Sequence, residues 1–146
     1  KIAIASAANR GTSNLRPGMN TSSQPVLVTR LDQLLNEEDQ QRIRLIKMDI
    51  EGFEFNAIQG MGDLIDRVDF LTCEVSPAFL LECDSSVEQL FSFMLNRGFI
   101  SFCAQPLSDS GWVKGDHTFE IQAEHSTHFD ALFCRPEYAD LVTRIK

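Results

Sequence analysis

The chain has 146 residues, 43% hydrophobic and 23% charged, a composition that predicts one globular domain spanning residues 1–146. Its 13 basic and 21 acidic residues leave a net charge of −8, and a negative surface repels phosphate, so we expect no nucleic-acid partner. Because no apolar run approaches the roughly 18–20 residues of a membrane span, and no leader pattern is seen, we expect a cytoplasmic protein without a membrane partner.

The cysteines are scattered, with no C-x-x-C pair and no Cys/His spacing typical of zinc sites: Cys73, Cys83, Cys103 and Cys134. The sequence therefore predicts no metal site. Three of them lie within apolar runs, which indicates small buried thiols in a reducing compartment.

The N-terminal part begins with a predicted buried strand at residues 1–8. Residues 9–25 are rich in Asn, Gly, Thr, Ser and Pro, which predicts a loop with room for a short hairpin. Residues 26–29 are strand-like, residues 31–35 begin a short helix, and a polar connector covers residues 36–42. The opening on an apolar run without an initiator Met leads us to expect that the natural protein begins upstream of Lys1.

The remaining elements alternate between strands and helices. Residues 43–50 are mostly apolar, as expected for a central strand covered on both faces, and Phe55, Ile58 and Met61 then recur at helical spacing. Residues 68–75 predict a second buried strand. Residues 87–95 predict an amphipathic helix that ends at Gly98. Strands are expected at residues 99–104 and 129–134, separated by a long polar segment at 105–127, and Pro136 suits the first turn of a terminal helix.

This order is the βαβ rhythm of a doubly wound α/β fold. The last two strands have no evident helix between them, which suits an antiparallel pair. We therefore expect a mostly parallel sheet closed by one antiparallel edge strand.

Acidic residues follow two of the predicted strands. Asp49 and Glu51 end one strand and Glu74 ends the next, where ligands bind in open α/β sheets. Alternation predicts that Asp49 and Glu51 lie on the same side, with Gly52 allowing a close turn into the helix. Such carboxylates can hold an ammonium group, accept a proton or coordinate a divalent cation; the structural alternative is that they cap the following helix.

The segment LIKMDIEGFEFNAIQGM at residues 45–61 resembles the signature of the FkbM family of methyltransferases. The family pattern, a strand ending in K-x-D-x-E-G before a helix, is matched by Lys47, Asp49, Glu51, Gly52, Glu54 and Gly60. Three further segments are similar to family elements in the same order: residues 4–7, residues 28–35 and residues 72–75.

The resemblance implies a Rossmann-like class I methyltransferase fold and S-adenosylmethionine as cofactor. It implies methyl transfer to a hydroxyl of a small molecule, sugar or polyketide. Ser6, Asp49 and Glu51 would bind the cofactor, and Asp49, Glu51 or Glu74 would act as the base.

The sequence departs from the family at its N-terminal side. The Gly-rich cofactor loop and the ribose-binding acid are missing, and Ala7 or Ala8 replaces the acid near the adenine. The chain thus corresponds to the C-terminal part of the domain, without the strands that carry this loop. We expect residues 1–146 alone to bind S-adenosylmethionine weakly or not at all, and to be inactive.

The histidines compete with the acids for the role of base, because imidazole titrates near neutral pH. His117 and His125 lie in the long polar segment and His128 begins the last strand; solvated histidines are the simpler interpretation of each. Trp112 suits stacking on a planar substrate or anchoring of its loop.

Two interpretations from other classes stay open. In a metal-dependent 3′–5′ exonuclease, Asp49 and Glu51 would be a D-x-E metal pair and residues 125–130 an H-x-x-x-x-D element, although a helix rather than a strand is predicted after Glu51. In a non-catalytic α/β remnant, the domain would serve interaction or structure.

Overall fold

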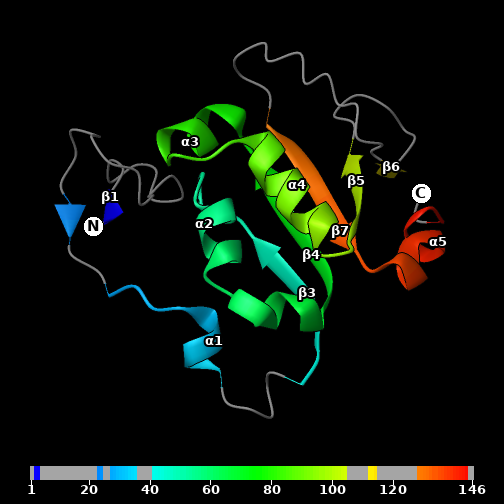
Figure 1. The fold of residues 1–146 in the computed structure, drawn as a ribbon. Coiled ribbons are helices and arrows are strands. Elements are labelled where there is room, and N and C mark those ends of the chain that lie inside the picture. Colours follow the sequence, from blue (N-terminus) through cyan, green and yellow to red (C-terminus); the bar gives the residue numbers. More distant parts are fainter. Residues whose placement is uncertain are drawn as a thin grey trace.

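A computed structural model describes residues 2–3, 23–24, 27–35, 41–104, 112–114 and 128–144. Its main sheet has five strands in the order β3-β4-β7-β5-β6 (Figure 1). These are β3 (Ile43–Met48), β4 (Val68–Val75), β5 (Ile100–Ala104), β6 (Trp112–Lys114) and β7 (Phe129–Cys134). The protein is a mixed α/β structure.

The prediction of a mostly parallel sheet is wrong. Among the described strands of this sheet only β3 and β4 pair in parallel, whereas β4–β7, β5–β7 and β5–β6 are antiparallel. The antiparallel pair of the last two predicted strands is confirmed as β5–β7, but β7 is not at an edge. It lies between β4 and β5, because the chain passes over this position on its way from β4 to β5 and fills it later with β7. Residues 131–134 of β7 are all buried there.

Strand β3 lies at the edge of the described sheet, not at its centre. Of its residues only Met48 is buried, and Leu45 is 59% exposed. The prediction of a central strand covered on both faces is therefore wrong, because β3 pairs only with β4 among the described residues and the exposed Leu45 shows that one face is not covered. Exposed Arg44 and Lys47 are the charged residues typical of an edge strand.

The N-terminal elements differ most from expectation. Strand β1 (Ile2–Ala3) pairs with β2 (Ser23–Gln24) in a separate two-stranded sheet. Of the strand predicted at residues 1–8, the structure describes only these two residues, and they are not part of the main sheet. The predicted strand at residues 26–29 is wrong, since residues 27–30 form no regular structure and Leu27 is 96% exposed. Residues 4–22 lie outside the described residues.

The helices largely follow the predictions. The expected ones are α1 (Leu31–Leu34), α2 (Glu54–Gln59), α4 (Val87–Asn96) and a terminal pair, η3 (Pro136–Tyr138) followed by α5 (Ala139–Val142). Two others were not predicted: η2 (Gly62–Arg67) and α3 (Pro77–Glu82). Helix α3 has a side-chain cap from Ser76 and a proline in its first turn, a start signal that the sequence contains.

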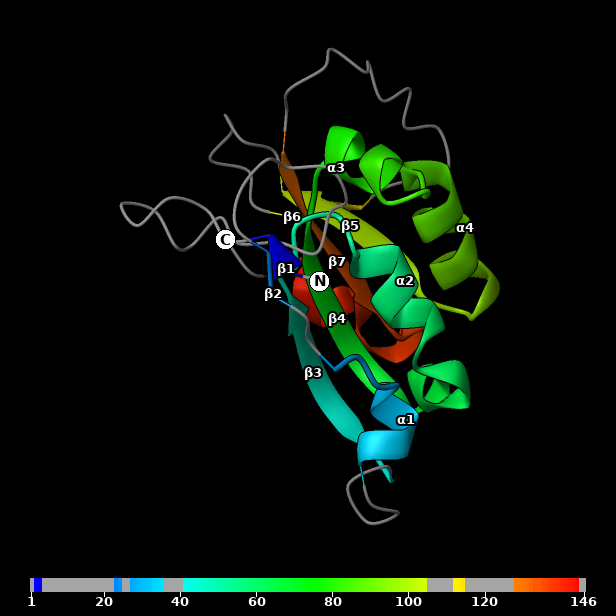
Figure 2. The ribbon, with the colours of Figure 1, turned by 90° about the vertical axis from the view of Figure 1, so that its left-hand side faces the viewer.

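Helices α2, α3 and α4 cover one face of the sheet (Figure 2). The main core lies between them and the sheet, where β4 contributes Leu71, Cys73 and Val75. A smaller cluster on the other face joins Phe102, Leu132 and Cys134 to Val142 of α5. Buried thiols are thus part of both layers, and burial raises the pKa of Cys103 and Cys134 to about 11, which keeps these thiols protonated. Within the described ranges, no helix combines the length and apolar character that crossing a bilayer requires.

Candidate functional site

A tight turn joins β3 to α2 and carries the acidic motif. The strand ends at Met48, and both Glu51, with φ 57°, and Gly52, with φ 101°, adopt left-handed backbone conformations. A Cβ atom on Gly52 would lie 2.5 Å from the carbonyl oxygen of Phe79, so only glycine fits there. A left-handed conformation at a residue other than glycine costs about 1 kcal/mol or more, and the surrounding packing stabilises it at Glu51.

A small hollow opens beside this turn, at the carboxyl ends of β3 and β4. Its lining contains all three acids predicted as catalytic, within the set Asp49, Glu51, Gly52, Glu54, Glu74, Ser76, Phe79 and His128. The predicted convergence is therefore observed. Alternation along the strand was the predicted cause, but Asp49 and Glu51 lie after the end of β3. The left-handed turn brings them to the same side instead.

Glu74 and His128 lie next to each other in the lining of the hollow, with the His128 Nδ1 3.4 Å from the Glu74 Oε1. The antiparallel register pairs Val75 with Phe129, which places the start of β7 beside the end of β4. The ring of Phe79 contacts the imidazole edge to face, with centroids 5.2 Å apart. His128 thus belongs to the site, although solvation was its simpler interpretation. The apolar run in β7, typical of a central strand, was the signal that could have placed it there.

Glu54, in the first turn of α2, is almost completely buried, with 1% of its surface exposed. One carboxylate oxygen, Oε1, accepts a hydrogen bond from the Ile50 N–H at 3.2 Å, and this bond closes the turn. The other, Oε2, has no hydrogen-bond partner among the described residues. Burial raises the pKa of Glu54, against the backbone hydrogen bonds that lower it, so the hollow holds a carboxyl group inclined to keep its proton.

The alternative of helix capping receives no support from the geometry. The N-cap of α2 is Phe53, and no side chain makes a cap hydrogen bond there. Asp49 instead lies 3.8 Å from Lys47 in an exposed ion pair. The described residues contain no group of three or more His, Cys, Asp or Glu side chains placed to hold a metal ion. The observed carboxylates can accept protons or bind positively charged groups.

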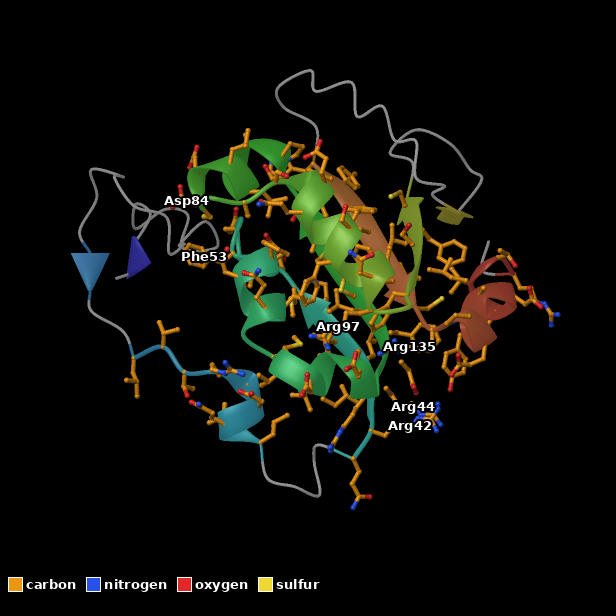
Figure 3. The ribbon with its side chains drawn as sticks, in the orientation of Figure 1. Arg42, Arg44, Phe53, Asp84, Arg97 and Arg135 are labelled. Carbon is orange, nitrogen blue, oxygen red and sulfur yellow. The ribbon has the colours of Figure 1, made fainter. Side chains whose placement is uncertain are left out.

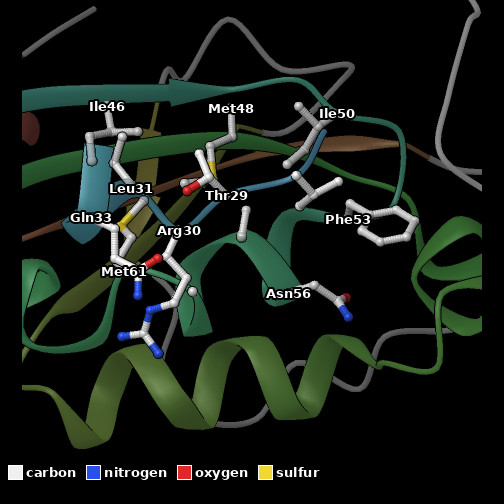
Figure 4. A pocket seen from close by; sticks show the side chains of 13 residues that line it. Thr29, Arg30, Leu31, Gln33, Ile46, Met48, Ile50, Phe53, Asn56 and Met61 are labelled. Carbon is white, nitrogen blue, oxygen red and sulfur yellow. The ribbon is translucent and has the colours of Figure 1, made fainter. Parts of the chain in front are cut away.

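A larger groove of about 630 Å³ lies on the other side of the same turn. Figure 4 shows Ile46 and Met48 of β3 facing Asn56 and Met61 of the α2 region across it, with Thr29, Arg30 and Leu31 along its border. Ile50 and Phe53 line this groove, whereas Asp49 and Glu51 line the hollow. The turn therefore separates an acidic site from a mainly apolar one.

Several predicted residues fall outside the described residues: Ser6, Ala7, Ala8, His117 and His125. For Trp112 the structure describes the backbone, as part of β6, which the sequence did not predict. The D-x-E pair is followed by helix α2, not by the antiparallel strand expected of an exonuclease.

Residues 1–101 match the family model described as the methyltransferase FkbM domain. The matched range includes Asp49, Glu51, Glu54 and Glu74, and it ends before His128. Searches of curated proteins and of solved structures found no match.

Proposed function

Because the chain belongs to the family of FkbM methyltransferase domains, we propose that it is part of an S-adenosylmethionine-dependent methyltransferase that methylates a hydroxyl oxygen. The acceptor would be a small molecule, sugar or polyketide. One observation carries the proposal: within the matched residues, the turn after β3 gathers Asp49, Glu51 and Glu74 around one hollow at the strand ends. Ligands of open α/β sheets bind at this position.

The residues of the hollow fit the charged end of the cofactor. S-adenosylmethionine bears a sulfonium, an ammonium and a carboxylate group there, and it would supply an electrophilic methyl group. The acids of the hollow suit its two positive groups: the side chain of Asp49 is 53% exposed, and Glu51 is half-buried. Ser6 would contact the opposite end by family resemblance.

The task of the chain is to align the acceptor oxygen and to receive its proton. Carboxylates around the hollow favour the approach of positive charge and stabilise it as it develops on a base. Asp49, Glu51 and Glu74 line the hollow and are the proposed catalytic residues.

The remaining details of the proposal concern fold and location. Strands β4 and β5 run in the same direction, since both are antiparallel to β7, and β3 is parallel to β4. Three strands with one orientation support a Rossmann-like sheet. Buried thiols at Cys73, Cys103 and Cys134 support a reducing, cytoplasmic location.

The proposal is tested by expressing the complete open reading frame and incubating it with S-adenosylmethionine and a panel of hydroxyl compounds. Formation of S-adenosylhomocysteine that depends on an acceptor is the expected result. Asp49→Asn should reduce kcat/KM by about 100-fold or more, because it removes a carboxylate facing developing charge. Asp140→Asn, an exposed carboxylate outside the hollow, serves as the matched control. Turnover that Asp49→Asn leaves unchanged contradicts the assignment, and the absence of turnover with every acceptor favours a non-catalytic domain.

Calorimetry of residues 1–146 with S-adenosylmethionine gives a second test. We expect weak or no binding, because the family's Gly-rich loop is not in this sequence. Micromolar affinity would contradict this expectation.

A further inference from the structure

We propose that His128 is the general base for the acceptor hydroxyl and that Glu74 is the residue that positions it. This inference rests on the proposed methyltransferase function and assigns one step of it. His128 lies beyond the residues that match the family model, so the family comparison does not assign it.

The contact with Glu74 distinguishes the two ring nitrogens. Nδ1 of His128 lies 3.4 Å from Oε1 of Glu74, so this carboxylate is beside the Nδ1 side of the ring. A carboxylate in this place favours the tautomer with the proton on Nδ1. Nε2, on the far side of the ring, then retains its lone pair and can accept a proton.

The ring is held and yet accessible. Phe79 contacts it at an interplanar angle of 82°, and the pairing of β4 with β7 fixes the backbone beside it. The side chain of His128 is 44% exposed and that of Glu74 is 47% exposed. The exposed part of the ring leaves room for a substrate hydroxyl, which a fully packed structural histidine would not permit.

Acidic side chains lie on several of the elements around the ring: Asp49 and Glu51 on the turn, Glu74 on β4, and Asp130 opposite Glu74 on β7. Lys47 makes an exposed ion pair with Asp49. The ring of His128 therefore lies in an acidic part of the molecule.

The step balances without another reagent. The acceptor oxygen forms a bond to the methyl carbon of S-adenosylmethionine, and the electron pair of the broken carbon–sulfur bond stays on sulfur. The hydroxyl proton passes to Nε2 of His128, and the imidazolium later loses it to water.

Nitrogen NMR of the histidine rings tests the geometry without turnover. In protein labelled with ¹⁵N-histidine, the neutral ring of His128 should show its proton on Nδ1 and a bare Nε2. Glu74→Gln should reduce the share of this tautomer, and the control Asp140→Asn should not. A wild-type ring with its proton on Nε2 would overturn the proposal.

Kinetics of the complete protein then separate this inference from the proposed function. His128→Gln should lower kcat by about 100-fold or more with little change in the KM for S-adenosylmethionine, as loss of a general base predicts. Glu74→Gln should lower kcat by a smaller factor, because the ring keeps its role as base and loses only the carboxylate that positions it. Wild-type turnover that persists in His128→Gln with an unchanged pH profile overturns the role of His128 and leaves the methyltransferase assignment intact. If the wild type shows no turnover, both proposals fail.

Discussion

Charged side chains lie at both ends of the parallel strands β3 and β4, but they are paired more completely at the amino ends than at the carboxyl ends. At the amino ends, Arg42 and Arg44 pair with Asp69 at 2.9 and 3.0 Å. Arg97 and Arg135 lie near them, against η2 and the start of β4 (Figure 3). At the carboxyl ends, four carboxylates share the hollow with one histidine.

Arg135 shows how complete the pairing is at the amino ends. Its guanidinium donates to the carbonyl oxygens of Val68, Arg97 and Ile65 at 3.1, 2.6 and 2.9 Å. It also lies 3.9 Å from the centroid of the Phe99 ring. Each of its three guanidinium nitrogens donates a hydrogen bond to a backbone carbonyl of the same chain, so this arginine is structural.

The carboxyl ends show the opposite state. Among the described residues, Glu54 has a buried oxygen without a hydrogen-bond partner, and Glu51 has a left-handed backbone. Unsatisfied buried polar atoms and backbone strain are both unfavourable for stability and are often found where a protein binds or reacts. The satisfied end therefore stabilises the sheet, whereas the unsatisfied end is available for a ligand.

The largest effect on stability should come from Arg135→Met at the satisfied end. The change removes three hydrogen bonds from a charged donor and leaves partly buried carbonyls without it, so we expect a loss of about 3–4 kcal/mol in the free energy of unfolding. Urea denaturation measures it. Arg144→Met, an exposed arginine of the last turn, should change stability by less than about 0.5 kcal/mol. Equal effects of the two variants would show that the hydrogen bonds of Arg135 do not stabilise this end of the sheet.

Gly52→Ala should have the next largest effect, because the new Cβ would overlap the Phe79 carbonyl oxygen at 2.5 Å. We expect a loss of about 2–3 kcal/mol. Gly98→Ala is the matched control: its φ is also positive, at 81°, but the nearest atom to a new Cβ is 3.8 Å away. It should cost about 1 kcal/mol from backbone strain alone. A smaller loss at Gly52 than at Gly98 would show that the turn can relax.

The smallest effect should be seen with Glu54→Gln, and it should depend on pH. Because burial raises the pKa of Glu54 in the folded state, the wild-type chain loses stability as pH rises from the unfolded value of about 4.3 through the folded value. Glutamine does not titrate, so the variant should gain stability relative to wild type over this interval. Urea midpoints between about pH 4 and pH 8 measure the difference. Exposed Glu137→Gln should show no such trend, and a Glu54→Gln variant that loses relative stability with rising pH would indicate that the carboxylate is favourably bound.

Much of the local structure was predictable from the sequence. The apolar run VDFLTCEV gives β4 with the predicted bounds, and Gly98 ends α4 in the left-handed conformation expected of it. The three acids that the sequence singled out, Asp49, Glu51 and Glu74, line one hollow, and their catalytic role stays a prediction. These features depend on neighbouring residues along the chain, where periodicity and turn chemistry act.

The order of the strands was not predictable in the same way. An apolar segment reads alike whether it lies at an edge or in the centre, which is why β3 was expected at the centre and β7 at an edge. The pairing of His128 with Glu74 depends on that order, because it brings together residues separated by more than fifty positions.

The sequence was enough to predict most of the helices and strands, the family and the acidic turn after β3, because these depend on local backbone preferences and on a contiguous motif. Which charges are paired depends on the tertiary structure. Arg135 reaches its three carbonyls and Glu74 its histidine through the insertion of β7 beside β4, while Glu54 is buried with one oxygen unpaired among the described residues. The physical reason is that hydrogen bonds and desolvation depend on distances in space, which the spacing of residues along the chain does not specify.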